Sequence, residues 1–250
     1  MTPVDRRAFL RASARAATLA GVAPLALPSA WWAADVPRDR GPLYRAPVVR
    51  PTGLTLTARA GTAELTPGRP APILTLGDGP IAPTLVARTG DRATITLVNA
   101  LREPTILHWH GFRPPEAVDG HPRFAIDAGH RFEYDFVVDE PAGLYWYHPH
   151  PHMRTGEQVH RGMAGLFVVT DAVEEAIALP HDDDTLLLVL QDKRLDDSGR
   201  ITYAAMGHDM MEGFLGRTPF VNGVEAPRTS VGAGLVRLRM KGAVDELTKI

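Results

Sequence analysis

Two short stretches of the chain place histidines two residues apart, as His-Trp-His at residues 108–110 and His-Pro-His at residues 148–150. Side chains at positions i and i+2 of a strand lie on the same face, so each stretch would present two imidazoles together, with the intervening tryptophan or proline on the other face. Imidazole suits copper, zinc, iron and nickel. Four imidazoles from two neighbouring strands therefore predict a site for a metal of this kind rather than for magnesium.

Two further roles are compatible with these histidines. A single histidine is often a structural or exposed residue, because histidine is intermediate in burial. Two pairs within apolar, strand-forming sequence make that role much less plausible. A zinc hydrolase that uses three of the four rings also fits the ligand chemistry, but no clear general base stands in a matching sequence context.

The composition narrows the chemistry further. The 250 residues include no cysteine, which excludes disulfides, a cysteine nucleophile and a thiolate-bound copper or zinc within this chain. A metal here must be bound by histidine, methionine or carboxylate. The formal net charge is −2, with acidic and basic residues interspersed, so we expect neither a nucleic-acid partner nor a polybasic membrane surface.

The N-terminus has the pattern of an export signal. Arg6 and Arg7 precede a weakly hydrophobic stretch at residues 16–27, which is too short to span a bilayer. We predict that residues 1–34 are a twin-arginine signal peptide, with a chance Arg-Arg before an amphipathic helix as the alternative. The prediction implies the twin-arginine export machinery as a partner, a periplasmic or extracellular location and no transmembrane segment. Residues 35–52 are rich in proline and arginine and predict a linker or arm.

From residue 53 onward, apolar and polar residues alternate in short segments. These segments lie at residues 53–59, 84–88, 92–98, 105–112 and 131–138, and turn sequences between them leave no room for crossover helices. The pattern predicts an all-β fold, an antiparallel Greek-key sandwich or barrel, over residues 53–172. Residues 173–250 predict an incomplete second β domain, whose apolar run at 185–190 suggests a strand buried on both faces.

Four motifs together resemble the N-terminal half of a multicopper oxidase of the bacterial laccase type. They are His-Trp-His-Gly at 108–111, Tyr-Trp-Tyr-His-Pro-His at 145–150, Gly-Met-Ala-Gly-Leu at 162–166 with Gln158 before it, and Leu-Gln-Asp-Lys at 190–193. The resemblance runs from about residue 53 to residue 240. It implies a cupredoxin-like (plastocyanin-like) first domain followed by a partial second domain of the same kind.

The resemblance also implies roles for the histidines. His108 would bind the type 2 copper, and His110, His148 and His150 would bind the type 3 pair of a trinuclear cluster. In the family this cluster reduces dioxygen to water with electrons that a small reducing substrate delivers through a type 1 copper. Substrates would be phenols, other aromatic reductants or metal ions.

Asp119, in Val-Asp-Gly at 118–120, matches the family's carboxylate that helps to deliver protons to the cluster. A carboxylate near the site is chemically reasonable, because oxygen reduction consumes protons and metal-bound imidazoles are oriented by nearby acceptors. The alternative is an ordinary turn residue before Gly120.

The chain lacks several copper ligands that the family has. The family's type 1 site needs a cysteine, and the trinuclear cluster needs eight histidines, of which this chain supplies four. We interpret the chain as a truncated or frameshifted copper-dependent oxidoreductase that retains half of the cluster. We expect its incomplete second domain to expose apolar surface. A non-catalytic periplasmic copper-binding or structural cupredoxin module is the alternative.

Several further residues carry weaker signals. Met206, Met210 and Met211 with His208 could bind cuprous ion, although core packing is the more frequent role of methionine. We expect His152 at the rim of the site, and Trp146 and Tyr147 beneath the ligand strand. The histidines outside the two pairs are expected to be structural or exposed; they are His121, His130, His160, His181 and His208.

Overall fold

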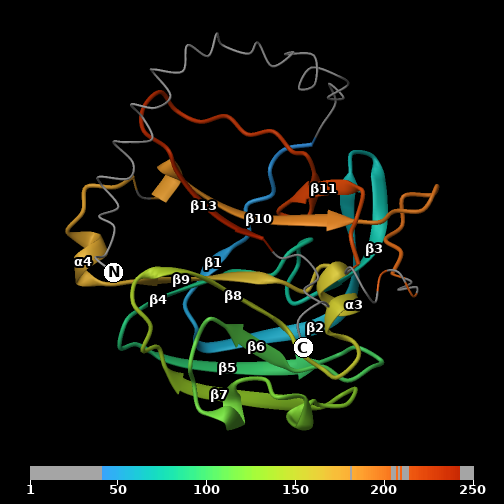
Figure 1. Ribbon diagram of the computed structural model, residues 1–250, viewed down its shortest axis with the longest axis horizontal. Helices are drawn as coiled ribbons and strands as arrows, with labels where there is room; N and C mark the ends of the chain where they lie inside the picture. The colour runs from blue at the N-terminus through green and yellow to red at the C-terminus, as the bar shows by residue number, and fades with distance from the viewer. Residues whose placement is uncertain (1–40, 181, 204–206, 208, 210–213, 243–250) are drawn as a thin grey trace, which may run out of the picture. The chain divides into compact units, whose positions relative to one another are not determined.

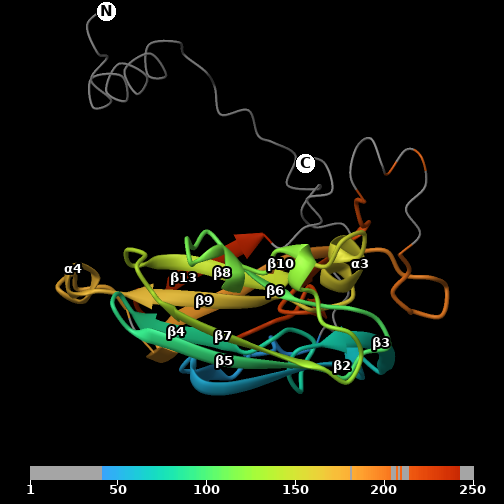
Figure 2. The ribbon, with the colours of Figure 1, turned by 90° about the horizontal axis from the view of Figure 1, so that it is seen from below.

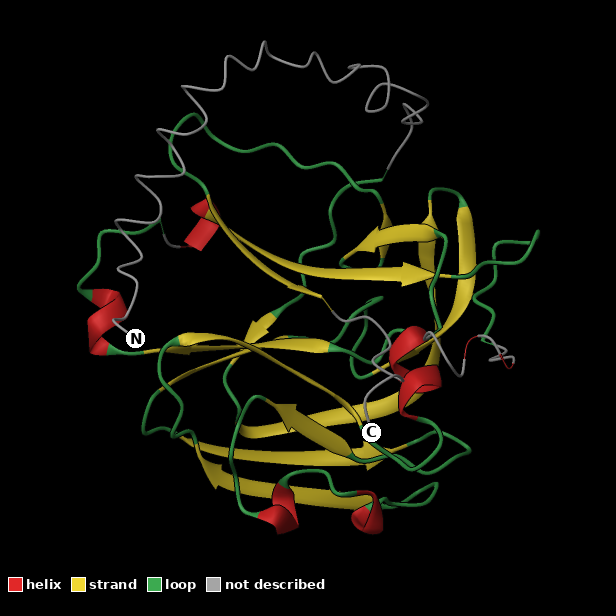
Figure 3. Ribbon diagram, viewed as in Figure 1, coloured by secondary structure: helices red, strands yellow, loops and turns green. Residues whose placement is uncertain are grey.

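Strands form nearly all of the regular structure, as the alternating pattern predicts (Figure 3). The computed structural model describes residues 41–180, 182–203, 207, 209 and 214–242. The predicted signal peptide and the methionine cluster with His208 lie outside the described residues. Among the residues described, no helix is long and apolar enough to cross a membrane.

The first part of the chain is a sandwich of two sheets (Figures 1 and 2). One sheet has the order β3-β2-β5-β7, with β2 at Thr52–Thr66, β3 at Arg69–Thr75, β5 at Arg92–Asn99 and β7 at Arg131–Val137. The other has the order β1-β4-β9-β8-β6, with β1 at Val48–Val49, β4 at Thr84–Arg88, β6 at Leu107–His110, β8 at Gly143–Pro149 and β9 at Gly165–Thr170. The all-β, cupredoxin-like fold class is confirmed.

Side-chain alternation explains how these strands form the core. In β5, Ala93, Ile95 and Leu97 are buried, whereas the residues between them are partly exposed. They pack with Trp109 and Phe167 of the other sheet in one apolar cluster. The predicted segments at 84–88, 92–98 and 131–138 correspond to β4, β5 and β7.

The strand directions differ from the predicted antiparallel arrangement. β5–β7, β6–β8 and β8–β9 are antiparallel, but β2 runs parallel to β5 and β4 runs parallel to both β1 and β9. The reason is that the chain leaves one sheet, contributes β4 to the other sheet and returns. β5 can therefore enter beside β2 in the same direction, without a crossover helix.

A third sheet follows the sandwich. Its order is β12-β11-β10-β13, with β10 at Thr185–Lys193, β11 at Thr218–Val221, β12 at Val224–Glu225 and β13 at Arg237–Gly242. In Figure 1, β10 and β13 lie beside β9, on the side away from β5 and β7. The short helices are α3 at Thr155–His160 and α4 at Ala172–Glu175, with 3-10 turns at Glu116–Val118 (η1), Pro122–Phe124 (η2) and Asp182–Asp184 (η3).

The expectation that the run at 185–190 is buried on both faces is wrong. Val189 is buried against Trp146 and Leu166 of the sandwich, whereas Leu190 on the opposite face is 38% exposed. Leu238 and Met240 of β13 are also exposed. One face of β10 packs on the sandwich; on the other face Leu186 is buried, whereas Leu190 and the paired-strand residues Leu238 and Met240 are exposed.

Polar groups also join the third sheet to the sandwich. The Nζ of Lys193, which is fully buried, donates a 2.6 Å hydrogen bond to the carbonyl of His160 at the end of α3. Arg237 and Arg239 of β13 both pair with the buried Glu174 of α4. Burial lowers the pKa of Lys193 to about 7, and only Asp192 opposes this effect.

Because Lys193 is buried, we predict that the free energy of unfolding rises with pH. Between the folded pKa of about 7 and the ordinary value of 10.5, the unfolded chain holds the Lys193 proton more tightly than the folded chain. The free energy of unfolding should therefore increase by about 2 kcal/mol from pH 7 to pH 9. Urea titrations should show this increase in wild type and in the control Lys241→Met, but not in Lys193→Met. An equal increase in Lys193→Met would contradict the assignment.

Candidate metal centre

The four paired histidines lie on one face of the sheet, next to its β6 edge. His108 and His110 are in β6, and His148 is in β8, directly opposite His108 in the antiparallel ladder. His150 follows the end of β8, and its N–H donates to the carbonyl of Ile106 at 2.8 Å, which continues the ladder by one pair. Because alternate residues share a face, this register brings both pairs together.

The rings are close to one another. The ring centroid of His108 lies 5.7 Å from that of His110, 5.4 Å from that of His148 and 5.3 Å from that of His150. The Nδ1 of His110 is 3.4 Å from the Nε2 of His148. One nitrogen each from His108, His110 and His148 lies within 4.8 Å of the other two, which is a spacing suitable for metal binding.

Trp109 and Tyr147 alternate with the histidines along β6 and β8 and face the core, as the alternation predicts for Trp109. Trp109 is fully buried, and its Nε1–H donates to the carbonyl of Val118 at 2.9 Å. Tyr147 is equally buried, and its hydroxyl donates to the carbonyl of Pro83 at 2.7 Å. The expectation for Trp146 is wrong: it shares the parity of His148 and lies beside that ring, with 4.3 Å between centroids.

Backbone carbonyls orient two of the rings. The Nδ1 of His108 lies 2.8 Å from the carbonyl oxygen of Asp119, and the Nδ1 of His148 lies 2.9 Å from that of Pro149. A carbonyl oxygen can only accept, so each Nδ1 carries the hydrogen and each Nε2 keeps its lone pair for a metal. The ring orientations therefore suit ligands that bind through Nε2.

Burial keeps the imidazoles of the β8 pair neutral. It lowers the pKa of His148 to about 3, and it also lowers the pKa of His150, with a smaller contribution from His108. A metal competes with protons for the ring nitrogens, so a neutral imidazole is the ligand form. These two rings need not lose a proton to bind a metal at neutral pH.

Asp119 lies in contact with the cluster. It follows η1, and its Oδ1 is 3.1 Å from the Nδ1 of His108, in addition to the contact through its carbonyl. Burial raises the pKa of Asp119, and the neighbouring His108 opposes this effect. The side chain and the backbone carbonyl of Asp119 therefore both lie where they can orient the His108 ring.

The remaining histidines of the described residues do not belong to this cluster, although His121 is close enough to His150 to lower its pKa. His152 is exposed, and His130 is exposed with its Nδ1 near the carbonyl of Ala128. The Nδ1 of His121 accepts from the N–H of Arg123 at η2. His160 is buried, and its Nε2 accepts from the N–H of Arg194. His181 lies outside the described residues.

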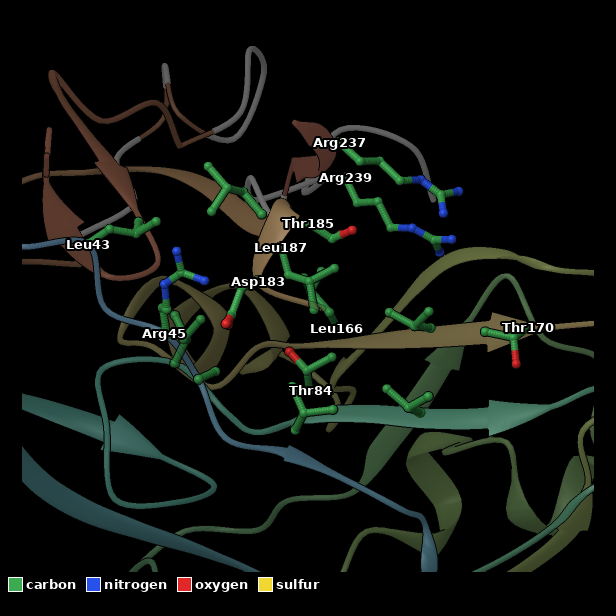
Figure 4. A pocket seen from close by; sticks show the side chains of 16 residues that line it. Leu43, Arg45, Thr84, Leu166, Thr170, Asp183, Thr185, Leu187, Arg237 and Arg239 are labelled. Atoms are coloured by element: carbon green, nitrogen blue, oxygen red, sulfur yellow. The ribbon is translucent and has the colours of Figure 1, made fainter. Parts of the chain in front are cut away.

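A separate cavity of about 510 Å³ lies between the sandwich and the third sheet (Figure 4). Apolar side chains such as Leu166 and Leu187 line it together with Arg45, Arg237 and Arg239. None of the four paired histidines contributes to its lining. The histidine cluster is therefore not part of this cavity.

The cupredoxin-like sandwich with a histidine cluster on one sheet defines the class of this protein. Residues 57–174 match the family model described as multicopper oxidase. This part of the chain is therefore a multicopper-oxidase-like domain.

Relatives of two kinds match the chain. It is 33% identical to "Multicopper oxidase mco" of Staphylococcus aureus over 186 residues, which cover 74% of this chain and 41% of that protein. It is also 33% identical to "Cell division protein FtsP" of Sodalis glossinidius over 244 residues, which cover 96% of this chain and 50% of that protein. The chain thus spans about half the length of the curated relatives it matches.

A solved structure agrees with the fold. The laccase-like multicopper oxidase CueO from Ochrobactrum sp. superposes with a TM-score of 0.76 at 35% identity, covering 81% of this chain and 47% of that chain. The comparison supports the cupredoxin-like fold of the described residues at the level of the backbone.

Replacing Gly120, the residue after Asp119, by alanine should lower the stability of the fold, because the added methyl group has no room. Gly120 has φ +76°, and a Cβ there would lie 2.2 Å from the carbonyl oxygen of Leu107 in β6. Gly129 has φ +82° with nothing within 4 Å of such a Cβ. Both alanine variants carry a left-handed backbone strain of about 1–2 kcal/mol. Gly120→Ala should lose more stability than Gly129→Ala, as measured by urea unfolding, because it also displaces β6. Equal losses would rule out the close approach.

Proposed function

We propose that His108, His110, His148 and His150 bind copper and form half of the trinuclear cluster of a multicopper oxidase. The observation that carries this proposal is the convergence of the four rings on one face of the sheet, with centroids 5.3–6.1 Å apart along the cluster. Structural histidines have little reason to gather in this way, because a partly buried imidazole nitrogen without a hydrogen-bond partner or a metal costs free energy.

The donor set fits copper. All four donors are imidazoles, which suit copper and do not suit magnesium or calcium. The Nδ1 of His150 is buried and makes no hydrogen bond of standard geometry among the described residues, although the backbone of Gly120 lies near the ring. The two Nδ1–H groups bound to carbonyls leave Nε2 lone pairs on His108 and His148. Copper, when bound, would supply the reduction of dioxygen to water that the family carries out.

The chain's own residues have separate roles in this proposal. His108 would bind the type 2 copper, and the other three histidines would bind the type 3 pair. The carbonyl of Asp119 fixes the His108 ring, and its carboxyl group lies beside that ring, where it could relay protons to the cluster. Trp146 covers His148 and His110 on the same face and limits their access to water.

The substrate and location follow from the family resemblance and the N-terminal pattern. We propose that the complete oxidase takes electrons from phenolic or other aromatic reductants, or from metal ions. Residues 1–34 would direct it through the twin-arginine machinery to the periplasm or beyond. The 250-residue sequence has no cysteine for a type 1 site, so we propose that this chain alone binds copper without oxidising substrate.

A non-catalytic role is the second candidate. The match to the cell division protein FtsP extends over 96% of this chain, whereas the match to the Staphylococcus oxidase extends over 74%. The same sandwich could therefore serve as a structural or copper-carrying module. Copper binding separates a retained metal site from a purely structural role.

Calorimetric titration of the purified full chain with Cu(II) tests the proposal. Removal of an outer-shell partner of a metal ligand costs about 10–100-fold in affinity, so His108→Ala combined with His148→Ala should cost more. The matched control is His130→Ala, which removes an exposed imidazole away from the cluster. Stoichiometric binding in wild type and in the control, and none in the double variant, is expected. Absence of binding in wild type would favour the structural role.

Oxidation of a phenolic dye tests whether this chain can oxidise a substrate by itself. We expect no turnover by the copper-loaded chain, because its four histidines lack a type 1 centre to receive electrons. Dioxygen uptake in an oxygen electrode with the dye as reductant provides the measurement. Steady turnover that disappears in the His108→Ala, His148→Ala chain would overturn the proposal that this chain is insufficient.

A further inference from the structure

β6 is the edge strand of its sheet, yet one of its outward N–H groups is not left to solvent. In an antiparallel ladder, alternate residues direct their N–H and C=O toward the partner strand and away from it. The bond from the N–H of His150 to the carbonyl of Ile106 places Ile106 and His108 among the residues that face β8. The N–H of Leu107, which lies directly before His108, therefore points away from β8.

Tyr134 supplies the partner for this N–H. It lies in β7, in the opposite sheet, and its hydroxyl oxygen accepts from the N–H of Leu107 at 2.7 Å. Tyr134 is 1% exposed, and its ring meets Trp109 edge-on with 5.0 Å between centroids. The Tyr134 side chain thus spans the core of the sandwich, and its hydroxyl reaches the backbone of β6, which carries core residues on one face and histidines on the other.

We propose that Tyr134 is a positioning residue for the copper ligands, because its hydroxyl fixes the backbone of β6 at Leu107 and thereby the places of His108 and His110. This inference rests on the proposed copper-binding function. Tyr134 lies on the far side of the strand from a metal, so its effect passes entirely through the backbone. On the same edge Gly120 lies close to the carbonyl of Leu107, since a Cβ at Gly120 would be 2.2 Å from that oxygen.

The hydroxyl is the informative part of this side chain. A phenylalanine would fill the core around Trp109 equally well, and a buried hydroxyl is unfavourable unless it is hydrogen-bonded. Without the Tyr134 oxygen, the Leu107 N–H would be a buried donor with no partner, and β6 would shift toward another acceptor. Metal sites tolerate displacements of only about 0.5 Å, so this shift should weaken copper binding.

Tyr147 provides a matched control. It belongs to the same apolar cluster, contacts Trp109 and is as deeply buried as Tyr134. Its hydroxyl also makes one hydrogen bond to backbone, but the acceptor is the carbonyl of Pro83, ahead of β4. Tyr134→Phe and Tyr147→Phe therefore remove the same group from the same core, and only the Tyr134 hydroxyl is hydrogen-bonded to the backbone of β6.

The experiment compares Cu(II) affinity, the electron paramagnetic resonance spectrum of bound Cu(II) and thermal unfolding in the two full-length variants and wild type. Tyr134→Phe should lower the affinity about tenfold and alter the copper hyperfine splitting. Tyr147→Phe should keep the wild-type affinity and spectrum, with a similar fall in melting temperature. Equal affinities and spectra in the two variants would overturn the positioning role. Loss of copper binding already in wild type would instead contradict the proposed function.

Amide hydrogen exchange tests the contact in the unaltered chain, even if Tyr134→Phe does not fold. In ¹⁵N-labelled wild type, the Leu107 amide should exchange slowly although it faces the free edge of β6. Exchange as fast as that of the amide of the exposed Ala128 would show that the Tyr134 hydroxyl does not hold this group.

Discussion

The histidine cluster depends on one strand pairing. β6 and β8 run antiparallel with His108 opposite His148, and this register alone decides which side chains share the outer face. A shift of β6 by one residue would turn Trp109 outward and bury His108 and His110, because side chains alternate with a period of two. The large aromatic rings in the core therefore specify the register, since burying Trp109 and Tyr147 is strongly favourable and burying four imidazoles is not.

A second set of contacts converts the register into a site with defined ring orientations. The carbonyl and carboxylate of Asp119 hold His108, and Gly120 allows that turn to lie directly against β6. The Tyr134 hydroxyl meets the strand from the core side. An edge strand is otherwise the least restrained part of a sheet, so contacts from a loop and from the opposite sheet are the physical means of keeping ligands on it in place.

The third sheet bears on the site through its attachment to the same sheet of the sandwich. Val189 packs with Trp146, and Lys193 binds the end of α3, the helix that follows His150. Gln158 of α3 is fully buried and accepts from the hydroxyl of Thr105, just ahead of β6. The segments on both sides of the histidine pairs are thus tied to one another, and β10 rests on this assembly with one face only.

The sequence by itself determined the fold class and the candidate ligands. Period-two alternation is a local property, and it identified β4, β5 and β7 and the common face of each histidine pair. The family motifs added Asp119 and the relationship to multicopper oxidases. The tertiary structure decided what depends on neighbours distant in the chain: the parallel pairing of β2 with β5, the exposed second face of β10 and the position of Trp146 beside His148. It also decided the role of Tyr134, because no local pattern shows that a tyrosine of one sheet will reach the N–H of Leu107 in the other.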